Sequence, residues 1–167
     1  MTQDEHYLRT IEEFGPALVR LIRTYEQDPE LRRDLSQDVH FALWRSLANF
    51  AGQCSLRTWV YRVANNTVIS ARLRRHKARL VSLEELADIP APDDPESAVG
   101  NSRVLARLHV LIRRLAPPDD QVMLLYLEDH GAASIAEITG LSARAVATRV
   151  HRIKHLLSRR FHQEDGQ

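Results

Sequence analysis

An acidic, proline-rich segment constrains the fold of this chain more than any other feature. Residues 81–100 contain three of the seven prolines and six acidic side chains, with no basic one. Proline removes a backbone donor and restricts the residue before it, so a continuous helix is not expected there. We therefore predict a flexible linker at 81–100 between two modules, 1–80 and 101–167, each with a small core.

The charge of the chain follows the same division. In total, 23 Lys and Arg oppose 22 Asp and Glu, a formal net charge of +1. Residues 1–80 carry 13 basic and 9 acidic side chains, and residues 101–167 carry 10 and 7. Two basic modules around an acidic linker are typical of a chain that binds a polyanion at two places, although solvated helix faces would give the same distribution.

Helical periodicity covers both modules, and no stretch alternates as a strand would. The predicted fold is all-α, with two small helical domains. In the first module we expect helices at 34–50 and from 56 toward 80, separated by a turn at 49–55. Asp34 and Gln37 are spaced as a capping pair. In the second we expect helices at 102–115 and 119–128, followed by two more around Gly140.

Residues 135–142 have the pattern of a helix-turn-helix. Gly140 suits the tight turn, Leu141 fills its corner, and Ser142 is the expected N-cap of an amphipathic helix through Leu157. The polar face of that helix carries no acid, and Arg and Thr on it suit the base edges and phosphates of a major groove. The alternative is a surface helix whose charges are only solvated.

The helix at 34–50 carries two large aromatic side chains on the side that should face solvent. Phe41 and Trp44 lie opposite its apolar face and beside Asp34 and Asp38, which predicts a docking surface for a basic protein. The alternative is a helix packed on both sides in a bundle. The next helix should expose Arg62, Asn65, Asn66, Ile69 and Arg72 before a basic run at 72–79. Amides and arginines of this kind suit unpaired bases.

Several classes of function lack support in the sequence. There is no Gly-rich phosphate loop, no HExxH and no Gly-x-Ser-x-Gly, so no enzyme, cofactor or small-molecule substrate is expected. His151 and His155 have metal-binding spacing without a third ligand nearby, and no metal is expected. One cysteine, Cys54, excludes an internal disulfide and favours the cytoplasm. No apolar run approaches the length of a membrane span, so membrane insertion is not expected.

Three segments together resemble one family. Residues 34–45, residues 55–66 with 72–75, and residues 115–157 resemble regions two and four of the extracytoplasmic-function sigma factors of bacterial RNA polymerase. The resemblance implies a non-catalytic initiation subunit that binds core polymerase, recognises the minus-10 and minus-35 promoter elements and promotes DNA melting. The first module would be region two, and the second would be region four.

The resemblance also implies a role for each site residue. Binding to the clamp helices of the beta-prime subunit is expected for Asp34, Gln37, Asp38, Phe41, Trp44 and Arg45. Contacts to the minus-10 element, with a flipped base in the loop 49–55, are expected for Asn49, Phe50, Gln53, Ser55, Arg62, Asn65, Asn66, Arg72, Arg74 and Arg75. Contacts to the minus-35 element are expected for Ser142, Arg144, Thr148, Arg149, His151, Arg152, Lys154 and His155.

Further partners follow from the same resemblance. Region four would grip the flap of the beta subunit, the linker would follow the RNA exit path, and an anti-sigma factor would hold the protein inactive. A competing hypothesis is a stand-alone helix-turn-helix regulator whose first module dimerises or binds an effector. The acid-flanked aromatic surface at 34–45 favours the sigma factor, because such a regulator does not need it.

Overall fold

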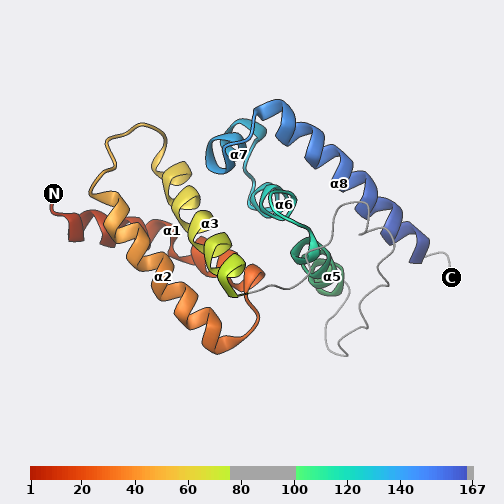
Figure 1. The fold of residues 1–167 in the computed structure, drawn as a ribbon, viewed down its shortest axis with the longest axis horizontal. Helices are drawn as coiled ribbons and strands as arrows, with labels where there is room; N and C mark the ends of the chain where they lie inside the picture. Colours follow the sequence, from red (N-terminus) through yellow and green to blue (C-terminus); the bar gives the residue numbers. More distant parts are fainter. Residues whose placement is uncertain (76–100, 165–167) are drawn as a thin grey trace. The chain divides into compact units, whose positions relative to one another are not determined.

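The structure is a computed structural model that describes residues 1–75 and 101–164, with the side chains of 1–75 and 103–160. The chain divides into two compact units, Met1–Ala78 and Arg79–Gln167. The described residues form seven helices and no strand, which confirms the all-α fold (Figure 1). The predicted linker at 81–100 and the end of the basic run, 76–79, lie outside the described residues.

The first unit is a bundle of three helices, each of which contacts the other two. They are α1 (Gln3–Tyr25), α2 (Pro29–Leu47) and α3 (Leu56–Arg75). The predicted apolar face of α2 is confirmed, since its side chains are almost completely buried. The core consists of Phe14, Leu18, Leu21, Ile22, Tyr25, Leu35, Val39, Leu43, Leu47, Val60, Tyr61, Ala64, Val68 and Ala71.

The starts of α1 and α2 are fixed by side-chain caps. Thr2 and Glu5 form a capping box, in which the Thr2 Oγ1 accepts from the Glu5 amide at 3.2 Å and Glu5 Oε2 accepts from the Thr2 amide at 2.9 Å. Asp28 caps α2 directly before Pro29, a first helical position that needs no amide partner. The predicted capping pair of Asp34 and Gln37 is therefore wrong, because both lie inside α2.

Polar contacts connect α1 to the other two helices. The Tyr7 hydroxyl lies 2.7 Å from His40 Nδ1 on α2. Burial lowers the pKa of His40 and raises the pKa of Tyr7, so a neutral imidazole faces a protonated phenol at neutral pH. At the other end of α1, the Tyr25 hydroxyl donates to Asn65 Oδ1 on α3 at 3.2 Å.

The second unit contains α5 (Asn101–Arg114), α6 (Asp119–Leu127), α7 (Ala132–Thr139) and α8 (Ala143–Glu164). The helix-turn-helix is confirmed as α7 and α8. Gly140 ends α7 with a φ of 81°, and Ser142 Oγ accepts from the Ala145 amide at 3.1 Å. α8 continues beyond the predicted end at Leu157. The core consists of Leu111, Ile112, Leu115, Val122, Met123, Leu124, Leu125, Ile135, Ile138, Val146, Ile153 and Leu157.

The length and composition of the helices decide whether any of them could span a membrane. Among the described residues, no helix is both long enough and apolar enough to cross a bilayer.

Candidate nucleic-acid interface

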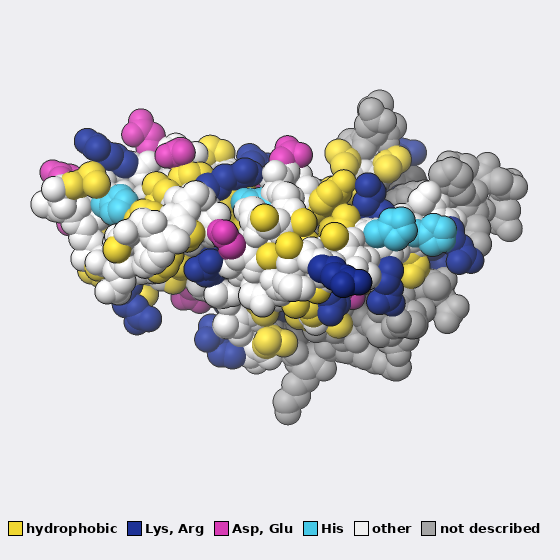
Figure 2. Space-filling view, turned by 90° about the horizontal axis from the view of Figure 1, so that it is seen from above, with side chains coloured by type: hydrophobic (Ala, Val, Ile, Leu, Met, Phe, Trp, Pro, Cys, Tyr) yellow, Lys and Arg dark blue, Asp and Glu magenta, His cyan; other side chains and the backbone are white. Residues whose placement is uncertain are grey.

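One face of α8 is polar, exposed and basic. The opposite face of α8 is buried and consists of Val146, Ile153 and Leu157. In the space-filling view, dark blue and cyan side chains gather along the part of the second unit where α8 lies (Figure 2). The exposed side chains of α8 include Arg144, Thr148, His151, Arg152, Lys154, His155 and Arg159. The predicted division of this helix into an apolar and a basic face is thus confirmed.

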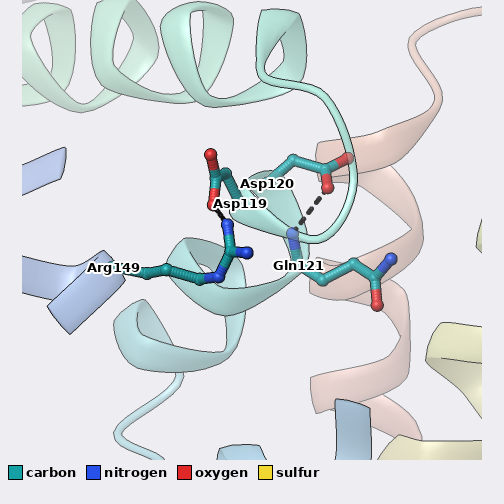
Figure 3. A network of polar contacts seen from close by, with 4 residues as sticks. All are labelled: Asp119, Asp120, Gln121 and Arg149. Atoms are coloured by element: carbon teal, nitrogen blue, oxygen red, sulfur yellow. Dashed lines mark hydrogen bonds and ion pairs between the residues drawn. The ribbon is translucent and has the colours of Figure 1, made fainter. Parts of the chain in front are cut away.

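Arg149 lies on the flank of α8 and not on the exposed basic face. It is about 140° around the helix from Arg144. Its guanidinium forms an ion pair with the Asp119 carboxylate on α6, at an N–O distance of 2.5 Å (Figure 3). The neighbouring Asp120 accepts from the Gln121 amide at 2.8 Å. Arg149 therefore connects α6 to α8, which differs from the DNA contact expected for it.

Removal of either partner of this ion pair should destabilise the second unit by a similar amount. The Arg149 side chain is 35% exposed and that of Asp119 is 15% exposed. We therefore expect the ion pair to contribute at most about 1 kcal/mol to the free energy of unfolding. Urea unfolding of Arg149→Ala, Asp119→Ala and the double variant should give a double variant less destabilised than the sum of the two. Arg149 would return to the DNA-binding set if Arg149→Ala weakened DNA binding and Asp119→Ala did not.

A groove of about 600 Å³ borders α8 on its other flank. Lys154 lies at this groove, where its Nζ is 5.3 Å from the ring centroid of Tyr126 and 3.3 Å from the Tyr126 hydroxyl. Two more residues predicted to contact DNA, His151 and His155, also line it. No group of three metal-ligating side chains occurs within the described ranges. The groove therefore combines cationic and apolar walls beside the exposed face of α8.

The outer side of α2 carries the predicted docking surface. Phe41 is 60% exposed and Trp44 is 37% exposed, and their rings stack with centroids 6.3 Å apart. The alternative of packing on both sides of α2 is therefore wrong for Phe41. We call the exposed set on α2 the docking surface. It consists of Asp34, Gln37, Asp38, Phe41, Trp44 and Arg45.

The loop between α2 and α3 is held by its own side chains. Gln53 accepts from the Ala51 amide at 2.8 Å and donates to the Asn49 carbonyl at 3.2 Å. Ser55 caps α3, because its Oγ accepts from the Thr58 amide at 3.0 Å. Phe50 is half-buried, with its ring centroid 5.4 Å from that of Trp59. The loop 49–55 thus has exposed polar side chains, and the packing of Phe50 on Trp59 holds it against α3.

The side chains of α3 that were expected to face solvent differ in exposure. Asn66 is exposed, as are Arg74 and Arg75 of the basic run, and Arg62, Ile69 and Arg72 are half-buried. Asn65 is completely buried, so its predicted exposure is wrong. Position 65 faces α1, where the Tyr25 hydroxyl binds its carbonyl oxygen. Asn65 therefore holds α3 to α1 and does not lie on the exposed surface of α3.

Asn65→Ala should destabilise the first unit by about 1 to 3 kcal/mol, because it leaves the buried Tyr25 hydroxyl without this acceptor. Asn66→Ala is the matched control, since Asn66 is exposed on the same helix, and it should change stability by less than about 0.5 kcal/mol. Denaturant unfolding followed by tryptophan fluorescence reports on this unit, because Trp44 and Trp59 are the two tryptophans of the chain. Equal effects of the two variants would contradict the assigned role of Asn65.

Comparison with known proteins identifies the family. Residues 10–79 match the family model of sigma-70 region 2, and residues 105–157 match that of sigma-70 region 4. The ECF RNA polymerase sigma factor SigG of Mycobacterium tuberculosis is 29% identical over 148 residues, which cover 74% of this chain and 40% of SigG. The chain belongs to the extracytoplasmic-function sigma factors. Its two units correspond to regions two and four.

Other relatives of this sigma factor match over more of their own length. The RNA polymerase sigma-H factor of Pseudomonas aeruginosa is 28% identical over 156 residues, covering 85% of this chain and 79% of that protein. A solved structure of CnrH in complex with the cytosolic domain of CnrY has the same fold, with a TM-score of 0.68 and 22% identity over 96% of this chain and 90% of that one.

The contribution of α1 to these surfaces was not predicted from the sequence. Gln3 and Asp4 contact Trp44 of the docking surface, and His6 contacts Phe50 of the loop. The capping box of Thr2 and Glu5 is a local signal that could have located the start of α1 in this sigma factor. It contains no information about the helices on which α1 packs.

Proposed function

We propose that this sigma factor binds core RNA polymerase through the docking surface on α2, against the clamp helices of the beta-prime subunit. The observation that carries this proposal is the pair of exposed, stacked rings of Phe41 and Trp44 beside the acids Asp34 and Asp38. Large aromatic side chains are the usual anchors of protein interfaces, and the surrounding carboxylates favour a basic partner. Gln37 and Arg45 complete the surface.

The proposed contact to the minus-10 element uses the loop 49–55 and the exposed side of α3. Asn49, Gln53 and Ser55 are exposed beside the half-buried Phe50, which favours a pocket for a base flipped out of the duplex. Along α3 the non-template strand would be held by amide and basic side chains. These are Arg62, Asn66, Arg72, Arg74 and Arg75.

The proposed contact to the minus-35 element uses α8 in the major groove. Arg144, Thr148, His151 and Arg152 would lie nearest to base edges, and Ser142 and basic neighbours would contact the backbone. Lys154 and His155 line the groove of about 600 Å³ that the protein itself forms beside α8. The apolar part of region four would bind the flap of the beta subunit.

The remaining parts of the proposal concern regulation and location. Residues 81–100 would connect a region-two domain at 1–80 to a region-four domain at 101–167, along the RNA exit path. The protein would act in the cytoplasm as a non-catalytic subunit that promotes melting. The relative CnrH was solved with the cytosolic domain of CnrY, which supports a protein partner of the anti-sigma kind here as well.

Reconstituted transcription tests this function directly. Purified core polymerase with this protein should start transcripts at defined positions on fragments of its own genome, and core alone should not. The competing hypothesis of a stand-alone regulator predicts DNA binding without core and no start sites. That second result would overturn the proposal.

A further inference from the structure

The first turn of α1 lies against the docking surface on α2. The Trp44 indole Nε1 donates to Asp4 Oδ1 at 2.7 Å, and Gln3 Nε2 donates to the Trp44 carbonyl oxygen at 2.8 Å. Both contacts join residues about forty positions apart in the sequence. In Figure 1 the beginning of α1 lies near the end of α2 that leads into the loop.

The same part of α1 also reaches the loop. The His6 ring lies 6.0 Å from the ring of Phe50, which packs on Trp59 at 5.4 Å between centroids. The Trp59 indole in turn donates to Ser46 Oγ at the end of α2, at 3.1 Å. One end of α1 thus contacts both the docking surface and the loop proposed to hold a base.

The contact to Asp4 bears on the orientation of Trp44. More than a third of Trp44 is exposed, so packing holds it less firmly than a core side chain, and a long side chain on a helix has more than one staggered rotamer. A hydrogen bond to a carboxylate is among the stronger side-chain contacts, and it selects one of these rotamers. In that rotamer the indole stacks on Phe41. A side chain already ordered before binding loses less entropy on association.

We propose that Asp4 is a positioning residue of the docking surface, which holds the Trp44 indole in the orientation that core polymerase binds. The first turn of α1 is then part of the polymerase-binding apparatus without being its contact surface. This inference rests on the proposed docking function of Phe41 and Trp44. It assigns Asp4 a role through Trp44, and not a direct contact to the polymerase.

The orientation of Trp44 is measurable without polymerase. In the ¹⁵N-labelled full chain, Asp4→Ala should shift the Trp44 indole N–H resonance and leave that of Trp59 in place. Asp4→Asn keeps an acceptor oxygen and should give a smaller shift. Glu12→Ala, which removes an exposed charge from the same helix, should leave both resonances unchanged. An unchanged Trp44 resonance in Asp4→Ala would overturn the inference.

Binding to core polymerase tests the functional half. Asp4→Ala should weaken core binding by about threefold to tenfold, the size expected when one interface side chain has to be ordered on association. Asp4→Asn should lose less, because it retains the acceptor. In a Trp44→Ala background, Asp4→Ala should have no further effect. An equal loss in both backgrounds would show that Asp4 acts without Trp44, and it would overturn the inference.

Failure of the docking function itself is a separate outcome. If Trp44→Ala and Phe41→Ala leave core binding unchanged, the docking surface is wrongly assigned and the functional role of Asp4 falls with it. If Trp44→Ala weakens binding and Asp4→Ala does not, the docking surface stands and only the positioning role is overturned.

Discussion

Replacement of both Phe41 and Trp44 by alanine should weaken binding of this sigma factor to core RNA polymerase by about 100-fold to 1,000-fold. Central aromatic anchors commonly cost about 2 kcal/mol or more each when truncated, and neighbouring losses are not fully additive. A combined loss of about 3 to 4 kcal/mol corresponds to this range. Competition with labelled wild-type protein for purified core measures the change.

Two controls make this result specific. Leu8→Ala removes a 65% exposed apolar side chain from α1, and it should leave core binding unchanged. Urea unfolding of the double variant should stay within about 1 kcal/mol of wild type, because neither ring is part of the buried core. A double variant that binds core normally would remove Phe41 and Trp44 from the interface. A double variant that fails to fold would show that the less exposed ring, Trp44, belongs to the core of the bundle.

Replacement of Arg144 and Arg152 together should weaken recognition of the minus-35 element by about 2 kcal/mol or more. A good bidentate contact of arginine to a base is worth about 1 to 3 kcal/mol of discrimination. Both side chains are exposed on the basic face of α8. Binding of holoenzyme to promoter variants substituted at each upstream position measures the loss and assigns it to particular base pairs.

The dependence on salt and sequence separates two roles for these arginines. Loss of a contact to a base relaxes the sequence preference at one promoter position. Loss of a contact to a phosphate weakens binding to all sequences alike, and it reduces the salt dependence of the affinity by about one released counterion. Arg149→Ala is the matched control, since it removes the same charge from the flank of the same helix, where Asp119 binds it. An unchanged footprint in the double variant would remove Arg144 and Arg152 from the readout.

The parts of the fold that sequence predicted are those with local causes. The turn at Gly140 and the cap at Ser142 depend on residues within a few positions of each other, and both occur as expected. The exposure of Phe41 followed from helical periodicity alone. Each of these features needs only the geometry of one helix or one turn.

The parts that sequence did not predict depend on distant partners. Asn65 is buried because Tyr25, forty residues earlier, supplies its hydrogen bond. Arg149 is basic and lies on the second helix of the helix-turn-helix, yet its angle on α8 brings it to Asp119 on α6. The start of α2 is an exception, because its signal is local and was missed: Asp28 is the cap and Pro29 is the first helical residue. Periodicity describes the face of a helix and not the helix that packs against it.

The helix-turn-helix separates the residues that fix α8 from those that face outward. The turn at Gly140, the cap at Ser142 and the buried side chains Val146, Ile153 and Leu157 set the orientation of α8. Arg144 and Thr148 are exposed and have no share in that core. If they read base edges as proposed, substitutions at these two positions change promoter preference at little cost in stability, and duplicated copies of such a gene diverge toward separate regulons while the scaffold stays folded.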